Sequence, residues 1–311
     1  MRPMSKLVIV GTVAFDDIET PFGRSDKILG GAATFIGLAA SQFSIDSALV
    51  SVVGDDFPKT YLDMFRDKGM DTSAIEVVNG GKTFFWSGRY HNDMNSRDTL
   101  STELNVLADF QPVVPETYLD AEVIMLGNLH PGIQLSVIEQ MNGRPNLIIL
   151  DTMNYWMDNT MEELLKVIGR IDVLTINDAE ARQLTGEYSL VIAARKIMEM
   201  GPTHVVIKKG EHGALLFHKE DVFFAPALPL EEVFDPTGAG DTFAGGFAGY
   251  LAKTADYSYE NMKNAVIFGS ALASFCVERF GTERLLSLTK QELHQRLQQF
   301  RNLTQFDIEL A

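Results

Sequence analysis

Short apolar segments rich in β-branched residues alternate along this chain with segments that have the apolar spacing of amphipathic helices. The segments of strand composition are Leu7–Val10, Ala48–Val53, Val123–Leu126, Leu147–Leu150, Val173–Ile176, His204–Ile207 and Ala214–Phe217. The segments of helical pattern are Ala32–Phe43, Lys59–Lys68, Ile133–Met141, Met161–Gly169, Ala179–Leu184 and Leu190–Met200. Alternation of this kind predicts an α/β fold with a mainly parallel sheet. Because strands such as Leu147–Leu150 are apolar throughout, we expect helices on both faces of the sheet.

Two stretches of the chain interrupt this alternation. Residues 11–30 and 81–107 carry no long helical pattern, and Thr83–Tyr90 has the aromatic composition of a strand. We predict a small β layer at about residues 12–30 and 81–107, which acts as a lid over a pocket. The chain has no evident linker or repeat, so residues 1–311 are expected to form a single domain that includes this lid.

Beyond residue 241 the pattern becomes helical. The two helical segments are Thr242–Lys253 and Met262–Glu278. Three glycines in the first segment, Gly245, Gly246 and Gly249, lower its helix propensity. We expect the close approach of another backbone to compensate for them.

Charge and cysteine content exclude several classes of protein. The formal net charge of −16 argues against a general nucleic-acid binder and against binding to an anionic membrane. The single cysteine, Cys276, cannot form an internal disulfide and is expected to be a buried thiol in a cytoplasmic protein. No apolar run approaches the ~18 residues of a membrane helix, and Leu7–Val10 is too short for a secretory signal.

The segment that carries chemistry runs from Asp235 to Phe247 and reads Asp-Pro-Thr-Gly-Ala-Gly-Asp-Thr-Phe-Ala-Gly-Gly-Phe. The small residues 238–240 precede a helix, so their N–H groups and the helix N-terminus form a predicted anion hole. Asp241 stands at the same place, where a carboxylate would repel phosphate. It is therefore expected to accept a proton from an attacking hydroxyl. The alternative interpretation is that Asp241 caps the helix, and the two roles are compatible.

This segment resembles the C-terminal signature of the ribokinase-like (PfkB) carbohydrate kinase family almost residue for residue. The resemblance extends along the chain through Gly11–Asp16, Gly30-Gly31, Val53–Phe57, Asn177–Glu180 and Val205–Gly213. It implies a ribokinase-like three-layer α/β/α domain with a small β lid. It also implies transfer of the γ-phosphoryl group of ATP to an alcohol.

The resemblance implies a role for each matching residue. Gly238, Ala239 and Gly240 would stabilise the transferring phosphoryl group, and Asp241 would be the catalytic base. The acceptor would meet Asp16, Gly30, Gly31 and Phe35. The nucleotide would meet Asn177, Lys208 and Gly210, together with Gly238 and Gly240. Asn177 and Glu180 would hold Mg²⁺ through water, and Asp235 and Thr237 would form a loop for a monovalent cation such as K⁺.

One position departs from the family pattern. Phe35 stands where many sugar kinases of this family carry an Asn that bonds the sugar. The resemblance as a whole predicts a sugar or sugar-like acceptor. Because Phe35 departs from the sugar-kinase pattern, a nucleoside is the alternative. A catalytically silent sensor is disfavoured because it has no need of Asp241. A thiamine-precursor or pyridoxal kinase is disfavoured if the β lid is extended.

The aromatic strand also predicts an assembly. An eight-residue stretch of the small β layer contains four aromatic residues: Phe84, Phe85, Trp86 and Tyr90. This layer has little core of its own in which to bury them. We predict a homodimer held by the lid strands. The alternative is a monomer in which these rings pack onto the substrate pocket.

Other candidate sites carry less weight. Gly81-Lys82-Thr83 lacks the glycine and the helix that a P-loop requires, and the histidines have no zinc-ligand spacing. A polar cluster follows the aromatic strand: Arg89, Asn92, Asp93, Asn95, Arg97 and Asp98. It is either a solvated turn or a lid loop that touches substrate. Asn154 is a further candidate pocket residue.

Overall fold

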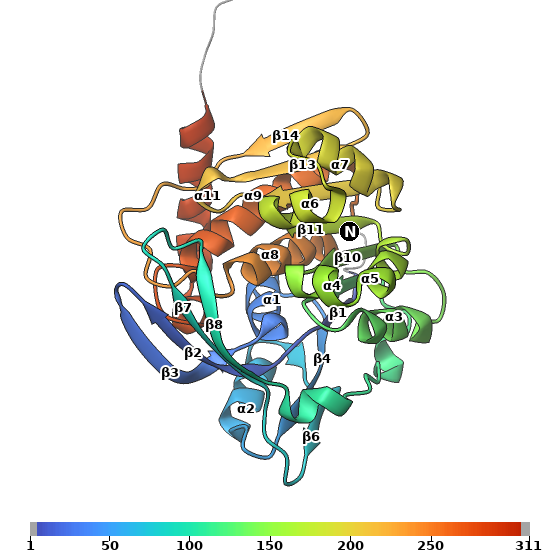
Figure 1. Ribbon diagram of the computed structural model, residues 1–311, viewed down its shortest axis with the longest axis vertical. Coiled ribbons are helices and arrows are strands. Elements are labelled where there is room, and N and C mark those ends of the chain that lie inside the picture. Colours follow the sequence, from blue (N-terminus) through green and yellow to red (C-terminus); the bar gives the residue numbers. More distant parts are fainter. Residues whose placement is uncertain (1–4, 306–311) are drawn as a thin grey trace, which may run out of the picture.

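The computed structural model describes residues 5–305. Within them a ten-stranded sheet has the order β14-β13-β12-β11-β10-β9-β1-β4-β5, and β6 pairs with β4 (Figure 1). Its strands are β1 (Leu7–Val10), β4 (Ser47–Gly54), β5 (Met70–Asp71), β6 (Ile75–Val78), β9 (Val123–Leu126), β10 (Leu147–Asp151), β11 (Val173–Asn177), β12 (His204–Lys208), β13 (Ala214–His218) and β14 (Asp221–Ala225). All pairings are parallel except β12–β13 and β13–β14. The predicted α/β fold with a mainly parallel sheet is confirmed.

Helices cover both faces of this sheet, as the apolar strands predict. Successive side chains of a strand point to opposite faces, so Leu7 and Ile9 join one buried cluster while Val8 and Val10 join the other. The first face carries α1 (Ala32–Ser41), α8 (Ala239–Thr254) and α9 (Tyr259–Cys276). The second carries α3 (Pro131–Gln140), α5 (Met161–Ile168), α6 (Asp178–Thr185) and α7 (Leu190–Glu199). None of the described helices is both long and apolar enough to cross a membrane.

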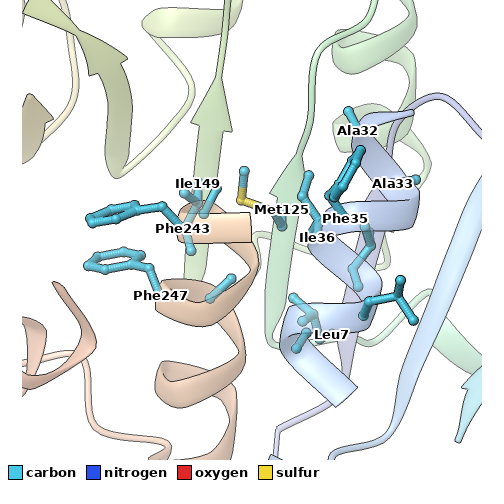
Figure 2. Close-up of a cluster of buried hydrophobic side chains, with 14 of the residues drawn as sticks. Leu7, Ala32, Ala33, Phe35, Ile36, Met125, Ile149, Phe243 and Phe247 are labelled. Atoms are coloured by element: carbon cyan, nitrogen blue, oxygen red, sulfur yellow. The ribbon is translucent and has the colours of Figure 1, made fainter. Parts of the chain in front are cut away.

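Helices α1 and α8 pack closely over the middle of the sheet. Figure 2 shows Phe35 and Ile36 on α1 and, on the side of α8 that is turned away from α1, Phe243 and Phe247; all four belong to one buried cluster. A Cβ on Gly245 would lie 2.3 Å from the carbonyl oxygen of Ile36. The expected close backbone approach at this glycine is confirmed, and it fixes the position of the start of α8 above the sheet.

A second, four-stranded sheet has the order β3-β2-β7-β8 and is called the small sheet below. It consists of β2 (Ala14–Thr20), β3 (Gly23–Gly30), β7 (Phe85–Tyr90) and β8 (Arg97–Glu103). Figure 1 shows these strands together on one side of the molecule, apart from the main sheet. The sequence predicts a β layer from these two stretches. Pairing between β2 and β7 joins them, and that pair is parallel.

Both tips of the small sheet rest on the chain segment that leads into α8. At the β2–β3 turn, the ring of Phe22 lies 5.6 Å from that of Phe234, measured between centroids. At the end of β7, the Tyr90 hydroxyl accepts a hydrogen bond of 3.2 Å from the Thr237 hydroxyl. The small sheet is therefore braced against the site segment rather than standing free of it.

The remaining elements complete the chain. The short helices are α2 (Lys59–Asp67), α4 (Asn154–Asn159) and α10 (Glu283–Ser287), with 3₁₀ turns at Asn105–Asp109, Glu116–Tyr118 and Gly210–His212. Helix α11 (Lys290–Thr304) packs on α9. Cys276 is fully buried, as expected, and burial raises the pKa of its thiol to about 12.

Candidate active site

The turn before α8 has the backbone conformation that its glycines permit. Gly238 is the N-cap residue with φ +74°, in the left-handed region that favours glycine. The N–H of Ala239 is occupied within the turn, since it donates to the carbonyl of Pro236 at 3.2 Å. Within residues 5–305, the N–H groups of Gly238, Gly240 and Asp241 have no such backbone partner. The donors free for an anion are thus those of Gly238, Gly240 and Asp241, and not that of Ala239.

Asp241 lies in the first turn of α8, among charges of both signs. Burial raises the pKa of Asp241 to about 7, and the neighbouring carboxylate of Asp151 contributes to the rise. Lys208 and Arg97 oppose it, and Glu180 adds to it. The side chain is therefore a carboxyl group that changes its protonation near neutral pH, which suits a general base.

Lys208 ends strand β12 and reaches the middle of the site. Its Nζ donates to the Oδ2 of Asp151 at 2.5 Å, and it lies 3.2 Å from the place that a Cβ on Gly240 would take. Burial alone would lower the pKa of Lys208, but Asp151, Glu180 and Asp241 raise it overall. Lys208 is thus a buried cation beside the N-terminus of α8.

Asp151 is a site residue that the sequence reasoning missed. It ends the buried strand β10, and its own pKa is raised because burial outweighs the opposing effect of Lys208. The available signal was its place after an apolar strand, since ligands of open α/β sheets bind at the carboxyl ends of the strands.

Asn177 and Glu180 belong together at the next strand end. Asn177 is paired in register with Lys208 across β11 and β12. Its Oδ1 accepts the N–H of Glu180 at 2.8 Å, while the Oε2 of Glu180 accepts the N–H of Asn177 at 3.0 Å, so the two form a capping box on α6. Burial raises the pKa of Glu180 to about 7 despite this bond.

Asp16 lies in β2, where the glycines of β3 make room for it. A Cβ on Gly30 would fall 1.9 Å from the Oδ2 of Asp16, so only glycine fits beside this carboxylate. The N–H of Gly31 bonds the carboxylate and lowers its pKa. Burial, followed by the charges of Asp235 and Asp241, nevertheless raises the pKa of Asp16 to about 8. The structure thus brings Asp16 and Asp241 into one electrostatic group.

Phe35 is buried, so its ring is not an open surface on which a ligand could stack. Its side chain is 1% exposed, and its ring would lie 2.5 Å from a Cβ on Gly238. The ring therefore fills the space beneath the turn of the anion hole, and its contact with substrate stays a prediction.

Asp235 and Thr237 form a buried loop at the foot of the site. The carboxylate of Asp235 accepts the N–H of Thr237 and the N–H of Gly281, both at 2.8 Å. Burial raises the pKa of Asp235 above its ordinary value. Among the described residues, no lysine or arginine lies within 4.0 Å of this carboxylate.

Two further predicted residues lie at the rim. Gly210 follows β12 with φ +55°, and a Cβ there would meet the Oδ1 of Asn95, from the β7–β8 turn, at 2.8 Å. Asn154 begins α4, beside Trp156, whose Nε1 donates to the Oδ1 of Asn128 at 2.7 Å. Lys82 lies in a loop that leads into a strand, which is not the context of a P-loop.

The chain is similar in sequence and in structure to known proteins. A family model described as pfkB family carbohydrate kinase matches residues 6–288. The cytidine kinase of Thermococcus kodakarensis is 34% identical over 254 residues, which cover 79% of this chain and 89% of that protein.

Two solved structures show the same fold. The Methanocaldococcus jannaschii nucleoside kinase, a member of the ribokinase family, superposes with a TM-score of 0.75 at 22% identity, over 95% of this chain and 98% of the other. A Vibrio cholerae fructokinase double mutant, bound to fructose, ADP and potassium, has a TM-score of 0.78 at 20% identity, over 94% and 98%. The predicted ribokinase-like fold is confirmed. The chain belongs to the pfkB family of carbohydrate kinases and is an ATP-dependent kinase that phosphorylates a hydroxyl group of a sugar or nucleoside.

Proposed function

We propose that the acceptor is a nucleoside and that cytidine is its first candidate. The sequence alone favoured a sugar, with a nucleoside as the alternative. The order changes because the relative at 34% identity is a cytidine kinase. Phe35 supports the change, since it replaces the Asn that the resemblance associates with sugar recognition.

The observation that carries the proposed chemistry is the electrostatic grouping of Asp16 with Asp241. The charge of Asp241 raises the pKa of Asp16, and Asp241 lies in the first turn of α8. In our proposal Asp16 binds hydroxyl groups of the acceptor, while Asp241 accepts the proton of the attacking hydroxyl. The N–H groups of Gly240 and Asp241 would receive the charge of the transferring phosphoryl group, and Lys208 would lie beside it.

We also propose that two cations assist this site. Asn177 and Glu180 offer the oxygen atoms that suit Mg²⁺, which keeps much of its water and binds few protein groups directly. When bound, Mg²⁺ would neutralise charge on the ATP phosphates. Among residues 5–305 no cationic side chain pairs with the buried carboxylate of Asp235, so a K⁺ ion in the loop with Thr237 would balance its charge. The potassium in the fructokinase structure supports this part of the proposal.

We further propose that residues 1–311 form one kinase domain in which the small sheet acts as a lid. The contacts of Phe22 and Tyr90 with the segment before α8 support a lid that closes over the acceptor. A homodimer through this sheet remains our prediction.

A comparison of acceptors tests the proposal. The purified protein would be assayed for ADP release with ATP, Mg²⁺ and either cytidine, uridine, adenosine, inosine, ribose or fructose. We expect the highest kcat/KM with cytidine, and mass spectrometry should identify a nucleoside monophosphate. A higher kcat/KM with ribose or fructose than with every nucleoside would overturn it. Repeating the assay with Na⁺ in place of K⁺ tests the cation loop.

A further inference from the structure

Arg97 is the first residue of β8, at the tip of the small sheet that touches the site. Across the hairpin it pairs in register with Tyr90. Directly opposed residues of antiparallel strands project from the same face. Tyr90 is buried and bonds Thr237, two residues from the catalytic helix, so its face is the one turned toward the site. Arg97 therefore projects toward the site as well.

The next residue pair on the hairpin shows the opposite orientation. Arg89 pairs in register with Asp98, and its Nε bonds the Oε1 of Glu19 at 2.9 Å on the outer face of the small sheet. Asp98 in turn lies 3.0 Å from the Nε2 of His91. Arg97 has no carboxylate within 4.0 Å among the described residues, and its guanidinium lies 5.8 Å from the ring of Trp86. It is thus a cation not neutralised by a close ion pair.

Hydrogen bonds fix the turn that precedes Arg97, and the turn lies near the predicted nucleotide-binding loop. The Oδ1 of Asp93 accepts the N–H of Ser96 at 2.8 Å, and Ser96 accepts the N–H of His91 at 2.9 Å. The Oδ1 of Asn95 in this turn lies 2.8 Å from the place that a Cβ on Gly210 would take, and Gly210 follows the strand of Lys208. The turn therefore spans from the acceptor side of the site to the predicted nucleotide loop.

The charges of the site call for a cation at this place. Asp241, Asp151 and Glu180 surround one lysine, and that lysine is already paired with Asp151. A nucleotide triphosphate brings further negative charge to the same point. The guanidinium of Arg97 acts on two of these groups, since it opposes the rise in pKa that burial gives to Asp241 and to Glu180.

We propose that Arg97 is a catalytic residue supplied by the small sheet, whose guanidinium binds the oxygen atoms of the transferring phosphoryl group as the sheet closes over the acceptor. The proposal rests on the proposed function of the site. Arginine suits this role because its planar fork donates two parallel hydrogen bonds to phosphate oxygens. Closure of the sheet would then couple the presence of the acceptor to the completion of the phosphate site.

Substitution at Arg97, with Arg89 as the matched control, tests the proposal. In Arg97→Gln we expect kcat to fall by roughly 10²–10³-fold, the size typical of a lost transition-state donor. Arg97→Lys should restore part of the rate. Binding of ADP, measured by calorimetry, should change by no more than about threefold, because the charge develops in the transition state. Arg89→Gln should retain the wild-type rate, since its charge faces Glu19.

A pH profile separates catalysis from simple support of the fold. Without Arg97, the pKa of Asp241 should rise, so the midpoint of kcat/KM against pH should move to higher pH in Arg97→Gln but not in Arg89→Gln. A folded Arg97→Gln protein with unchanged kcat and an unchanged pH midpoint would overturn the proposal. If the wild-type protein uses only sugars, the proposed acceptor fails while the role of Arg97 is still judged against the wild-type rate.

Discussion

At the scale of single residues, the proposed role of Asp241 as the catalytic base yields a prediction. Replacing it by Asn keeps its size but removes the proton acceptor, so we expect Asp241→Asn to lower kcat by roughly 10²–10⁴-fold. Affinity for ADP should change little, since the donors of the turn belong to the backbone. Steady-state kinetics and calorimetry measure the two quantities. A variant with nearly wild-type turnover would show that another group is the base.

The raised pKa of Asp241 predicts the direction in which activity changes with pH. The carboxylate form is the base, so kcat/KM should rise as the pH passes about 7. Stability has the opposite dependence. In the folded protein the pKa of Asp241 lies above the ordinary 3.8. The contribution of Asp241 to folding stability is therefore fully present below about pH 4 and is lost as the pH rises to about 7. The groups that face Asp241 are Asp151, Lys208, Arg97 and Glu180. Asp241→Asn should remove the part of the decrease in folding stability with rising pH that is due to Asp241. Melting temperatures at pH 5 and pH 8 would measure this change.

Glu180 caps α6, and its proposed role in holding Mg²⁺ can be separated from that structural role. Glu180→Gln removes the charge that would hold the water of Mg²⁺, so we expect a higher Mg²⁺ concentration for half-maximal rate. The matched control is Glu292→Gln, because Glu292 forms the other capping box, with Thr289 at the start of α11. Both variants lose a carboxylate cap, but only the first should change the Mg²⁺ dependence. Equal dependence in both would place Glu180 outside the metal network.

The roles of Asp151 and Arg97 show where sequence reasoning ends at this scale. The signature before α8 identifies Gly238–Asp241 because those residues are contiguous. Asp151 pairs with Lys208 from a strand more than 50 residues away, and Arg97 comes from a separate sheet. Such groupings arise from tertiary contacts, and no local pattern in the chain records them. For the same reason the sequence could not show that Phe35 lies buried beneath Gly238.

At the scale of elements, the central strands and helices were predictable because each is either uniformly apolar or regularly amphipathic. The predicted strand His204–Ile207, for example, corresponds to β12, which extends one residue further, to Lys208. Start points were less certain, since α8 begins at Ala239, ahead of the expected Thr242. Strand β14 and helix α11 were not identified. Residues 221–225 are mostly exposed, and α11 is largely polar, so both lack the strong apolar signal of a core element.

The contact between α1 and α8 yields a prediction about stability. Gly245→Ala would place a methyl group 2.3 Å from the backbone of Ile36, which cannot move aside without shifting α1. The helix propensity of Ala should contribute about 1 kcal/mol in favour, but overpacking should destabilise by about 1–3 kcal/mol or more. Gly169→Ala is the control, because its new Cβ would meet atoms no nearer than 3.5 Å. Urea unfolding should show a lower midpoint for Gly245→Ala alone, and equal midpoints would contradict the close packing.

At the scale of the whole molecule, the small sheet and the residues next to it retain exposed apolar side chains. Tyr90 is turned inward against the site segment, and Phe85 packs on the core, so part of the aromatic strand is already covered within one chain. Phe22 in the β2–β3 turn, Leu100 in β8 and Leu104 directly after β8 nevertheless remain about half exposed, at 53%, 51% and 51%. Exposed apolar groups that form a patch are usually covered by a partner. A two-fold dimer through the small sheet would bury this surface.

The dimer is testable by light scattering on protein separated by size. We expect the mass of two chains at micromolar concentration. Leu100→Asp places a charge in the proposed interface and should yield monomers without loss of fold, because the side chain is exposed in the single chain. Val113→Asp is the control, since Val113 is 71% exposed but lies outside the small sheet. It should leave the dimer intact. A wild-type protein that stays monomeric would refute the interface, and the remaining apolar groups of the small sheet would then have to be explained by contacts with the acceptor.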